Sequence, residues 1–482
     1  MNNFKNLFKT RFAPSPSGYM HIGNIRSALF SYLCAKENDG FLILRIEDTD
    51  ITRTSEVFLN SIYFYLNWLS LNPDEGPQQG GSSAPYIQSE RSNIYKVYLE
   101  KFITLGFAYR CFKTVEELNE IREKQKLLGL PPRYERNSCL MNEEKEKELL
   151  NNNIPFVWRF KLPSGFTNVI DKVRNKIEYD LSNFADFPLT RQDATFTFLF
   201  ANFVDDVEMN IQYVVRGEEH TSNTALQSAM YDILKIEKPI FYHLPLICDI
   251  NGKKLSKRDF GFSLQDLINE NYLPEAIINY LILIGSSFEQ EIFSLEEAIN
   301  LKLFSKTKST GAICYDIKKL QWINKQWIKR ISLNDFMNRI SRIEENLSED
   351  MNLIESIKNE SNSLNDAIKY LNYFSNNYLL EIKYNDEFCK EDYKIIFANE
   401  FLKLITKLNN ENKNKEELFL SIKEFIKSFS KSNNIEEKKL MKLIRYILTL
   451  NEEGLGISVL LKYLSNDEII IRINKFIEFY SK

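Results

Sequence analysis

The first 46 residues carry the pattern that most restricts the fold of this chain. Residues 10–13 (TRFA) are predicted to form a buried strand, and PSPSG then makes a tight turn. Apolar residues follow at helical spacing from Ile22 to Leu33, before a second apolar strand, FLILRI, at 41–46. A strand, a helix and a strand with a short return form a right-handed βαβ unit. We therefore expect a doubly wound, Rossmann-like α/β sheet.

Length and composition are those of a soluble protein with several domains. At 482 residues the chain is too long for one hydrophobic core, so two to four domains are expected. No apolar run reaches the roughly 18 residues of a membrane span, and the first strand begins within about ten residues, too early for a targeting peptide. Six widely spaced cysteines show no disulfide framework. We expect a cytoplasmic protein with no membrane partner. A net charge of −4 neither indicates nor excludes a nucleic-acid partner.

Further along, the pattern divides the chain into regions. A stretch rich in Gly, Pro and Ser at 72–85 is expected to be a loop. Short helices and strands then favour an inserted α+β domain, after which the α/β pattern resumes with expected strands at 196–200 and 211–215. After Phe262 the periodicity is helical. The predicted parts are the two halves of the α/β domain at 1–109 and 191–260, the insertion at 110–190, a helical region at 261–329 and an all-helical domain at 330–482.

The segment PSPSGYMHIGN joins the first strand to the first helix. Ligands of open α/β sheets bind beyond the carboxyl ends of the strands, and a helix N-terminus offers free N–H groups to phosphate. Gly18 and Gly23 allow a close backbone approach, and His21 can donate an imidazole N–H to a phosphate oxygen. Taken alone, the segment is equally consistent with a Pro-Gly turn beside an incidental histidine. The predicted ATP-binding residues here are Pro14, Ser15, Pro16, Ser17, Gly18, His21, Gly23 and Asn24.

A second segment, NGKKLSKRD at 251–259, follows a late strand. Asn251-Gly252 predicts a turn, and Lys254 and Lys257 can clasp a triphosphate and neutralise departing pyrophosphate. By itself this segment is more simply an exposed, lysine-rich hairpin tip. The predicted ATP-binding residues are Lys254, Leu255, Ser256, Lys257 and Arg258.

The two segments belong to a longer series of motifs. In order, these are RFAPSPSGYMHIGNIRSALFSYL, RIEDTD, VVRGEEHTSNTALQ and GKKLSKRD. The series resembles the bacterial-type glutamate–tRNA ligase family of class I aminoacyl-tRNA synthetases, over residues 8–330. The resemblance implies ATP-dependent activation of L-glutamate and its transfer to tRNA by a monomeric enzyme with Mg²⁺. It implies His21, Lys254 and Lys257 as catalytic residues, an insertion that binds the acceptor stem, and a helical domain that binds the anticodon.

The resemblance also implies a glutamate pocket. Arginine suits a carboxylate because its planar guanidinium binds it through two hydrogen bonds. Without the motifs, an interdomain ion pair for Arg11 and Arg216 and helix capping for Glu47 would be the simpler interpretations. With them, Glu47 is expected to face the amino group. The implied glutamate-binding residues are Arg11, Ala13, Ser15, Glu47, Phe198, Asn202 and Arg216.

This chain departs from the family's pattern at two places. The family usually has D-G-x-P-T-Y where residues 193–198 read DATFTF, so Phe198 replaces a tyrosine expected to touch the amino acid. Losing that hydrogen bond costs about 0.5–1.5 kcal/mol. Some members hold zinc through a Cys-x-Cys pair, a tyrosine and a later cysteine. Here only Cys111, Tyr134 and Cys139 remain, so we expect no structural zinc.

Other residues have less specific roles. His220 is expected to border the ATP or acceptor-end site, whereas His243, on a strand, favours a structural role. The segment KKLQWINKQWIKR at 318–330 suits phosphate contact and base stacking. An amphipathic helix that buries its apolar residues is at least as simple an interpretation. Those residues are Leu320, Trp322, Ile323 and Trp327.

Three other functions compete with this interpretation. Glutamine–tRNA ligases and archaeal-type enzymes carry β-barrel anticodon domains, which the helical C-terminal half does not suggest. A tRNA-modifying paralogue lacks an anticodon domain, so the length argues against it. A catalytically silent RNA-binding paralogue is countered by the intact motif residues but supported by Ala194 and Phe198. The sequence leaves open whether tRNA for glutamate, glutamine or both is charged.

Overall fold

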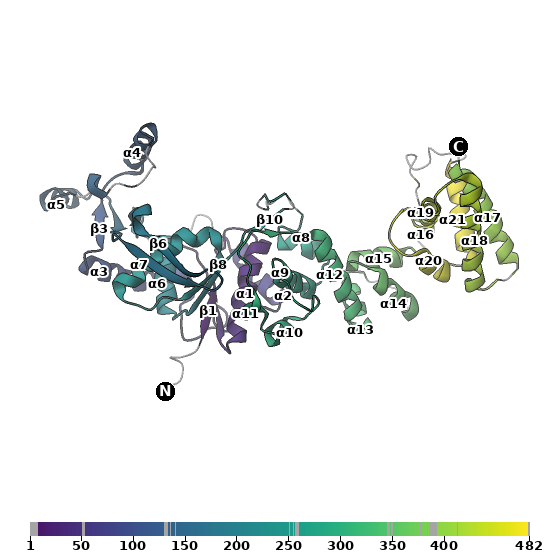
Figure 1. Ribbon diagram of the computed structural model, residues 1–482, viewed down its shortest axis with the longest axis horizontal. Coiled ribbons are helices and arrows are strands. Elements are labelled where there is room, and N and C mark those ends of the chain that lie inside the picture. Colours follow the sequence, from purple (N-terminus) through teal and green to yellow (C-terminus); the bar gives the residue numbers. More distant parts are fainter. Residues whose placement is uncertain are drawn as a thin grey trace. The chain divides into compact units, whose positions relative to one another are not determined.

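The chain folds into two compact units (Figure 1). The first comprises residues 1–266 and 278–316, and the second residues 267–277 and 317–482. Among the described residues, no helix is long and apolar enough to cross a membrane. The computed structural model describes residues 8–50, 54–129, 134, 136–139, 141–249, 251–253, 255, 260–344, 348, 350–375, 378–382, 384, 393–411 and 413–480.

The first unit is built on a six-stranded sheet. Its strands lie in the order β2 (Phe41–Leu44), β1 (Lys9–Phe12), β8 (Tyr213–Gly217), β9 (Ile240–Leu244), β5 (Phe166–Asp171) and β6 (Asn175–Asp180). Neighbouring strands are parallel, except that β5 and β6 form an antiparallel hairpin. Helix α1 (Ile22–Glu37) follows β1, and β2 returns beside β1. This arrangement confirms the predicted βαβ unit and the Rossmann-like class.

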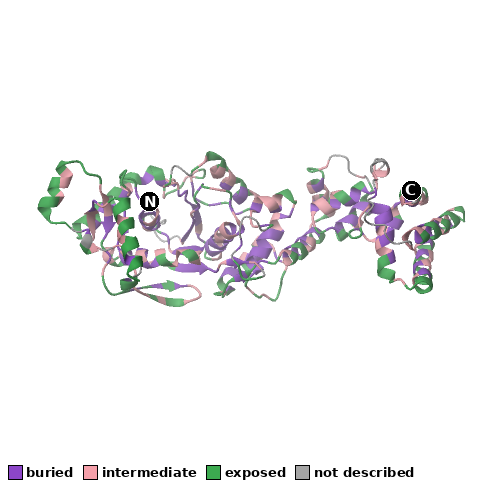
Figure 2. Cartoon of the chain, turned by 90° about the horizontal axis from the view of Figure 1, so that it is seen from above, coloured by how far each residue is buried: buried purple, intermediate pink, exposed green. Residues whose placement is uncertain are grey.

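The helices of the first unit pack through an aromatic core. Phe102 contacts Phe160 edge to face, with ring centroids 5.2 Å apart, and lies 6.2 Å from Phe200. The strand predicted at 196–200 is wrong, because helix α6 begins at Phe198. Figure 2 shows the buried residues along the sheet and the inward helix faces. Besides α1 and the two helices of the segment 110–190, the α-helices up to residue 306 are α2 (Glu56–Trp68), α3 (Ser92–Thr104), α6 (Phe198–Glu208), α7 (Thr221–Leu234), α8 (Leu264–Asn269), α9 (Pro274–Leu283), α10 (Leu295–Asn300) and α11 (Leu303–Lys306).

The segment from 110 to 190 contributes to two sheets. Strands β3 (Ala108–Cys111), β4 (Val157–Phe160) and β7 (Phe187–Pro188) form a separate antiparallel sheet, with helices α4 (Val115–Leu127) and α5 (Glu143–Asn151) between β3 and β4 in the sequence. The β5–β6 hairpin instead extends the six-stranded sheet through β9. Two short strands, β10 (Ile247–Cys248) and β11 (Ile313–Cys314), pair with each other.

The second unit is helical, and its described residues contain no strand, as predicted. In α12 the residues Leu320, Ile323 and Trp327 are buried, whereas Trp322 is 40% exposed with the Lys319 ammonium 4.1 Å above its ring. The amphipathic interpretation therefore holds for three of the four apolar residues. The helices are α12 (Ile317–Arg330), α13 (Leu333–Ile340), α14 (Met351–Glu360), α15 (Leu364–Asn372), α16 (Tyr378–Glu381), α17 (Tyr393–Asn410), α18 (Lys415–Asn433), α19 (Glu437–Thr449), α20 (Ile457–Tyr463) and α21 (Asn466–Tyr480).

Candidate active site

His21 caps the N-terminus of α1. Its Nδ1 accepts the backbone N–H groups of Gly23 (3.1 Å) and Asn24 (3.3 Å), and the Asn24 side chain accepts the His21 N–H at 3.1 Å. Because Nδ1 is an acceptor, the proton of the neutral imidazole lies on Nε2. A Cβ atom at residue 23 would lie 2.9 Å from Cε1 of His21, so glycine is needed for this ring position. The cap therefore fixes both the orientation and the tautomer of His21.

The chain that follows the lysine segment is bound to the start of α1. Phe262 stacks on the His21 ring at 4.9 Å, and its carbonyl accepts the Ile22 N–H at 3.0 Å. The predicted turn is present, with Gly252 at φ +78°. Leu255 is described and buried. The other predicted residues of this segment lie outside the described residues: Lys254, Ser256, Lys257 and Arg258.

A cleft of about 190 Å³ opens beside His21, beyond the carboxyl ends of β1 and β8. The residues predicted for ATP and glutamate that line it are Arg11, Ala13, Pro14, His21, Gly23, Asn24, Glu47, Phe198, Asn202, Arg216 and Leu255. The predicted residues Ser15, Pro16, Ser17 and Gly18 are not among its lining residues. Sequence reasoning missed Arg26 and Glu219, whose only signal was their position within the quoted motifs.

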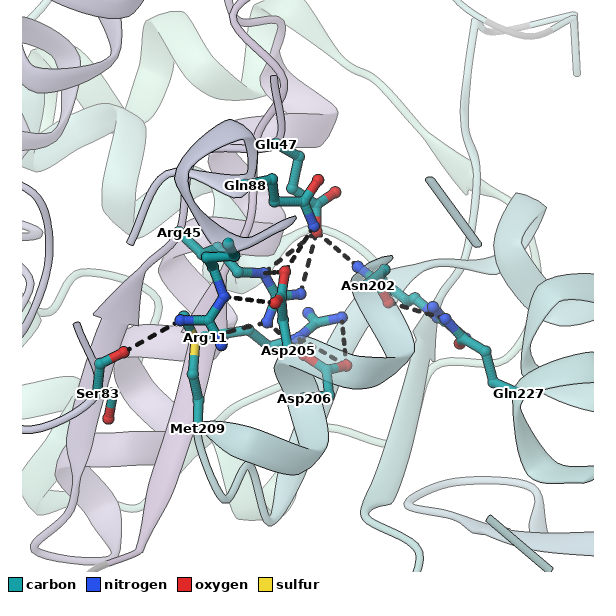
Figure 3. Close-up of polar contacts among 12 residues, drawn as sticks. Arg11, Arg45, Glu47, Ser83, Gln88, Asn202, Asp205, Asp206, Met209 and Gln227 are labelled. Carbon is teal, nitrogen blue, oxygen red and sulfur yellow. Dashed lines mark hydrogen bonds and ion pairs between the residues drawn. The ribbon is translucent and has the colours of Figure 1, made fainter. Parts of the chain in front are cut away.

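A buried network of charges supports one wall of the cleft (Figure 3). Arg45 Nη1 lies 2.7 Å from Asp206 Oδ1, and its Nη2 lies 3.0 Å from Glu47 Oε1. Arg11 pairs with Asp206 at 3.1 Å, within the same unit, and Asn202 donates to Glu47 Oε1 at 2.6 Å. Burial raises the pKa of Glu47 despite Arg45 and Arg11. Burial also opposes ionisation of Asp206, but the two arginines hold its pKa below the ordinary value.

Arg216 differs from Arg11 and Arg45 because no carboxylate lies within ion-pair distance of it among the described residues. Its Nη2 donates to Thr224 Oγ1 (2.6 Å) and Gln227 Oε1 (2.9 Å), while its Nε is buried without an acceptor. Burial lowers the pKa of Arg216 to about 10. A buried cation without a counter-ion is costly, and here it lines a cleft. The arrangement suits a ligand that brings its own carboxylate.

The same chain matches known families over nearly its whole length. Residues 8–322 match the family described as tRNA synthetases class I (E and Q), catalytic domain, and residues 313–477 match the anticodon binding domain family. The chain belongs to the class I tRNA synthetase family. This confirms the resemblance expected from the motifs and, with the helical second unit, the predicted fold class.

Several relatives of this synthetase are named glutamate–tRNA ligase. That of Natranaerobius thermophilus is 34% identical over 485 residues, covering 97% of this chain and 98% of the relative. That of Clostridium tetani is 42% identical over 334 residues, covering 69% of this chain and 68% of the relative. A solved structure is also similar: the crystal structure of a glutamate tRNA ligase from Elizabethkingia meningosepticum, in complex with its amino acid. It matches this structure with a TM-score of 0.77 at 32% sequence identity, covering 98% of this chain and 99% of that chain.

The departure at 193–198 lies at the cleft of this synthetase. Phe198 is the first residue of α6 and lines the cleft, 6.1 Å from the ring of His220. Burial, and then the charge of Arg216, lower the pKa of His220 to about 4, so its imidazole is neutral at physiological pH. Ala194 has φ +63°, in the left-handed region that favours glycine. The glycine usual in the family would therefore be less strained here.

The two cysteines of the segment 110–190, Cys111 and Cys139, lie together with Tyr134 beside them. Cys139 and Tyr134 hydrogen-bond to Cys111 and lower its pKa to about 5. The side chain of Lys113, which follows Cys111 by two residues, lies 3.8 Å from Glu117. Among the described residues, no group of three His, Cys, Asp or Glu is placed to hold a metal. Two thiols and one phenol do not complete a structural zinc site, so the absence of zinc stays a prediction for elemental analysis.

Proposed function

We propose that this chain activates L-glutamate with ATP and transfers it to the 3′ end of tRNA. The observation that carries the proposal is Arg216, a buried cation without a counter-ion in the cleft that also holds the capped His21. Its relatives named glutamate–tRNA ligase agree with this assignment.

In this proposal Arg216 and Glu47 bind opposite charges of glutamate. Arg216 receives the side-chain carboxylate. Glu47 uses Oε1 for Arg45 and Asn202, whereas Oε2 has no hydrogen-bond partner within the described part of the chain. Oε2 therefore receives the α-ammonium group. Arg11 is less available, since Asp206 and the Val215 carbonyl occupy its N–H groups.

The proposed chemistry has two displacements and needs no protein nucleophile. An oxygen of the glutamate α-carboxylate attacks the α-phosphorus of ATP, and the bond to pyrophosphate breaks. A ribose hydroxyl of tRNA then attacks the adenylate carbonyl, loses its proton and releases AMP. His21 donates its Nε2 proton in a hydrogen bond to a phosphate oxygen, where charge develops. Lys254 and Lys257 are proposed to bind the departing pyrophosphate.

Magnesium would enter this site with the nucleotide. Mg²⁺ is held through substrate phosphates and one or two carboxylates, and it neutralises phosphate charge. This fits a cleft in which the described residues offer no cluster of three metal ligands. We further propose that the insertion contacts the tRNA acceptor stem, that the region matching the anticodon binding domain contacts the anticodon, and that the enzyme is a cytoplasmic monomer.

Glutamate-dependent ATP–pyrophosphate exchange in the presence of tRNA tests the proposal. The wild type should exchange with glutamate, and Arg216→Gln should raise the KM for glutamate while His21→Ala lowers kcat. Lys96→Gln, at an exposed position on α3 outside the insertion, serves as the control. Charging assays with purified tRNA for glutamate and for glutamine distinguish the acceptor. Absence of exchange by the folded wild type with either tRNA would refute the proposed function.

A further inference from the structure

A chain of three buried side chains lies behind Arg216. Thr224 Oγ1, on α7, lies 2.6 Å from Arg216 Nη2 and 2.7 Å from His243 Nε2, on β9. His243 Nδ1 in turn lies 2.8 Å from Asp171 Oδ2, at the end of β5. Thr224, His243 and Asp171 are at most 1% exposed, and none of them lines the cleft. Thr224, however, contacts two residues that do line it, Arg216 and, at 3.2 Å, the His220 carbonyl.

The hydrogen bonds that join Asp171, His243, Thr224 and Arg216 all have the same direction, with each residue donating to the one nearer Asp171. Asp171 accepts the backbone N–H groups of Val173 (3.0 Å), Arg174 (2.9 Å) and His243 (3.1 Å). Burial opposes its ionisation, but the hydrogen bond from the His243 side chain and these backbone N–H groups hold its pKa at about 2. An ionised carboxylate only accepts, so the His243 proton lies on Nδ1 and Nε2 is an acceptor. Thr224 Oγ1 lies 3.2 Å from the His220 carbonyl but only 2.7 Å from His243 Nε2, so its single hydroxyl proton goes to Nε2. Its lone pairs are left to accept the Arg216 N–H.

A second hydrogen-bonded path joins Arg216 to the carboxylate of Glu47. Gln227 accepts from Arg216 at 2.9 Å and donates to Asn202 Oδ1 at 2.9 Å, and Asn202 donates to Glu47 at 2.6 Å. Figure 3 shows Gln227, Asn202 and Glu47 in line. Two hydrogen-bonded paths thus meet at Nη2 of Arg216, and each of them ends at a buried carboxylate. The guanidinium cannot move Nη2 without breaking at least one of them.

We propose that Asp171, His243 and Thr224 are positioning residues that hold Arg216 for the substrate carboxylate and thereby set the affinity for glutamate. The inference rests on the proposed function, because it assigns the glutamate contact to Arg216. Nη2 is fully used by Thr224 and Gln227, which leaves Nε and Nη1, on opposite sides of Cδ, to donate single hydrogen bonds to a carboxylate. Asp171, His243 and Thr224 act on glutamate binding and not on the transfer steps, since His21 belongs to a separate set of hydrogen bonds.

Steady-state charging by Thr224 variants tests the inference. Thr224→Val keeps the shape and removes the hydroxyl, so the KM for glutamate should rise about tenfold, while kcat and the KM for ATP change less than about twofold. Thr224→Ser restores the hydroxyl and should restore the KM for glutamate. An unchanged KM for glutamate in the valine variant, or equal impairment by valine and serine, would overturn the inference. Failure of the wild type to use glutamate would instead refute the proposed function.

The tautomer of His243 gives a second test, whose first measurement uses the wild-type protein. The chain contains three histidines, so ¹⁵N-histidine spectra are simple. We expect an Nδ1–H form for His243 and an Nε2–H form for His21. Asp171→Asn should invert the His243 tautomer and raise the KM for glutamate, because an amide N–H cannot accept from Nδ1. An Nε2–H form of His243 in the wild type would overturn the inference.

Discussion

Arg45 stands at the centre of the buried charge network, so its removal should weaken the first unit strongly. Its guanidinium is fully buried and contacts Glu47, Asp205 (3.6 Å) and Asp206. In Arg45→Met, Asp206 keeps Arg11, and Asp205 keeps Arg91 at 2.6 Å. Glu47 keeps only the Asn202 amide. One buried carboxylate thus loses its cation, which costs about 3–5 kcal/mol of unfolding free energy near pH 7.5.

The pH dependence of this loss has a defined sign. Burial already raises the pKa of Glu47 in the wild type, and removal of Arg45 must raise it further. A carboxyl group whose folded pKa exceeds its unfolded pKa weakens the fold above the folded pKa. That penalty shrinks as pH falls from the folded pKa to the unfolded pKa, below which the group is protonated in both states. The deficit of Arg45→Met should therefore shrink from pH 8 towards pH 5.

Urea unfolding followed by tryptophan fluorescence measures this deficit. Replacing Trp322 and Trp327 by Phe leaves Trp68 and Trp158 as reporters, both in the first unit. Arg122→Met, at an exposed position, should change the free energy by less than about 0.5 kcal/mol. A loss below about 1 kcal/mol for Arg45→Met at pH 7.5, or one that grows as pH falls, would refute the reasoning.

Two further substitutions test the cleft, and a third tests the strained backbone at Ala194. Gly23→Ala should displace the His21 ring and lower kcat of exchange by about 10- to 100-fold without loss of thermal stability; unchanged kcat would contradict the role of the cap. Phe198→Tyr should lower the KM for glutamate about two- to tenfold through one added hydrogen bond, and an equal or higher KM would show that the hydroxyl finds no acceptor. Ala194→Gly should raise the unfolding free energy by about 0.5–1 kcal/mol in a urea titration, because φ +63° strains alanine; Ala225→Gly, inside α7, should lower it.

Local patterns predicted those parts of the site whose hydrogen bonds are local. The turn, the start of α1 and the place of His21 depend on contacts within three residues, and the sequence contains them all. The segment FTFLF at 196–200 alternates like a strand, yet it enters a helix. Phe200 packs with Phe102 in the core, a contact that a five-residue window does not contain.

Long-range partners could not be predicted in this way. Arg45 and Asp206 are 161 residues apart, and His243 and Asp171 are 72 apart. No spacing rule links such positions, and only the folded sheet brings them together. The interpretation of His243 as structural followed from its alternation on a strand, whereas its hydrogen bond to Thr224, and so its link to Arg216, was not visible.

The pairing of the β5–β6 hairpin with β9 limits how this enzyme can be recombined. A graft that exchanges the whole of 110–190 with a homologue would also replace Asp171 and Arg174, which hydrogen-bond to His243 behind the cleft. A graft that ends before Phe166 would leave them in place. The segment 110–190 is therefore not an independent structural unit. In a chimera, β5 and β6 should come from the same parent as β9 and the residues around the cleft.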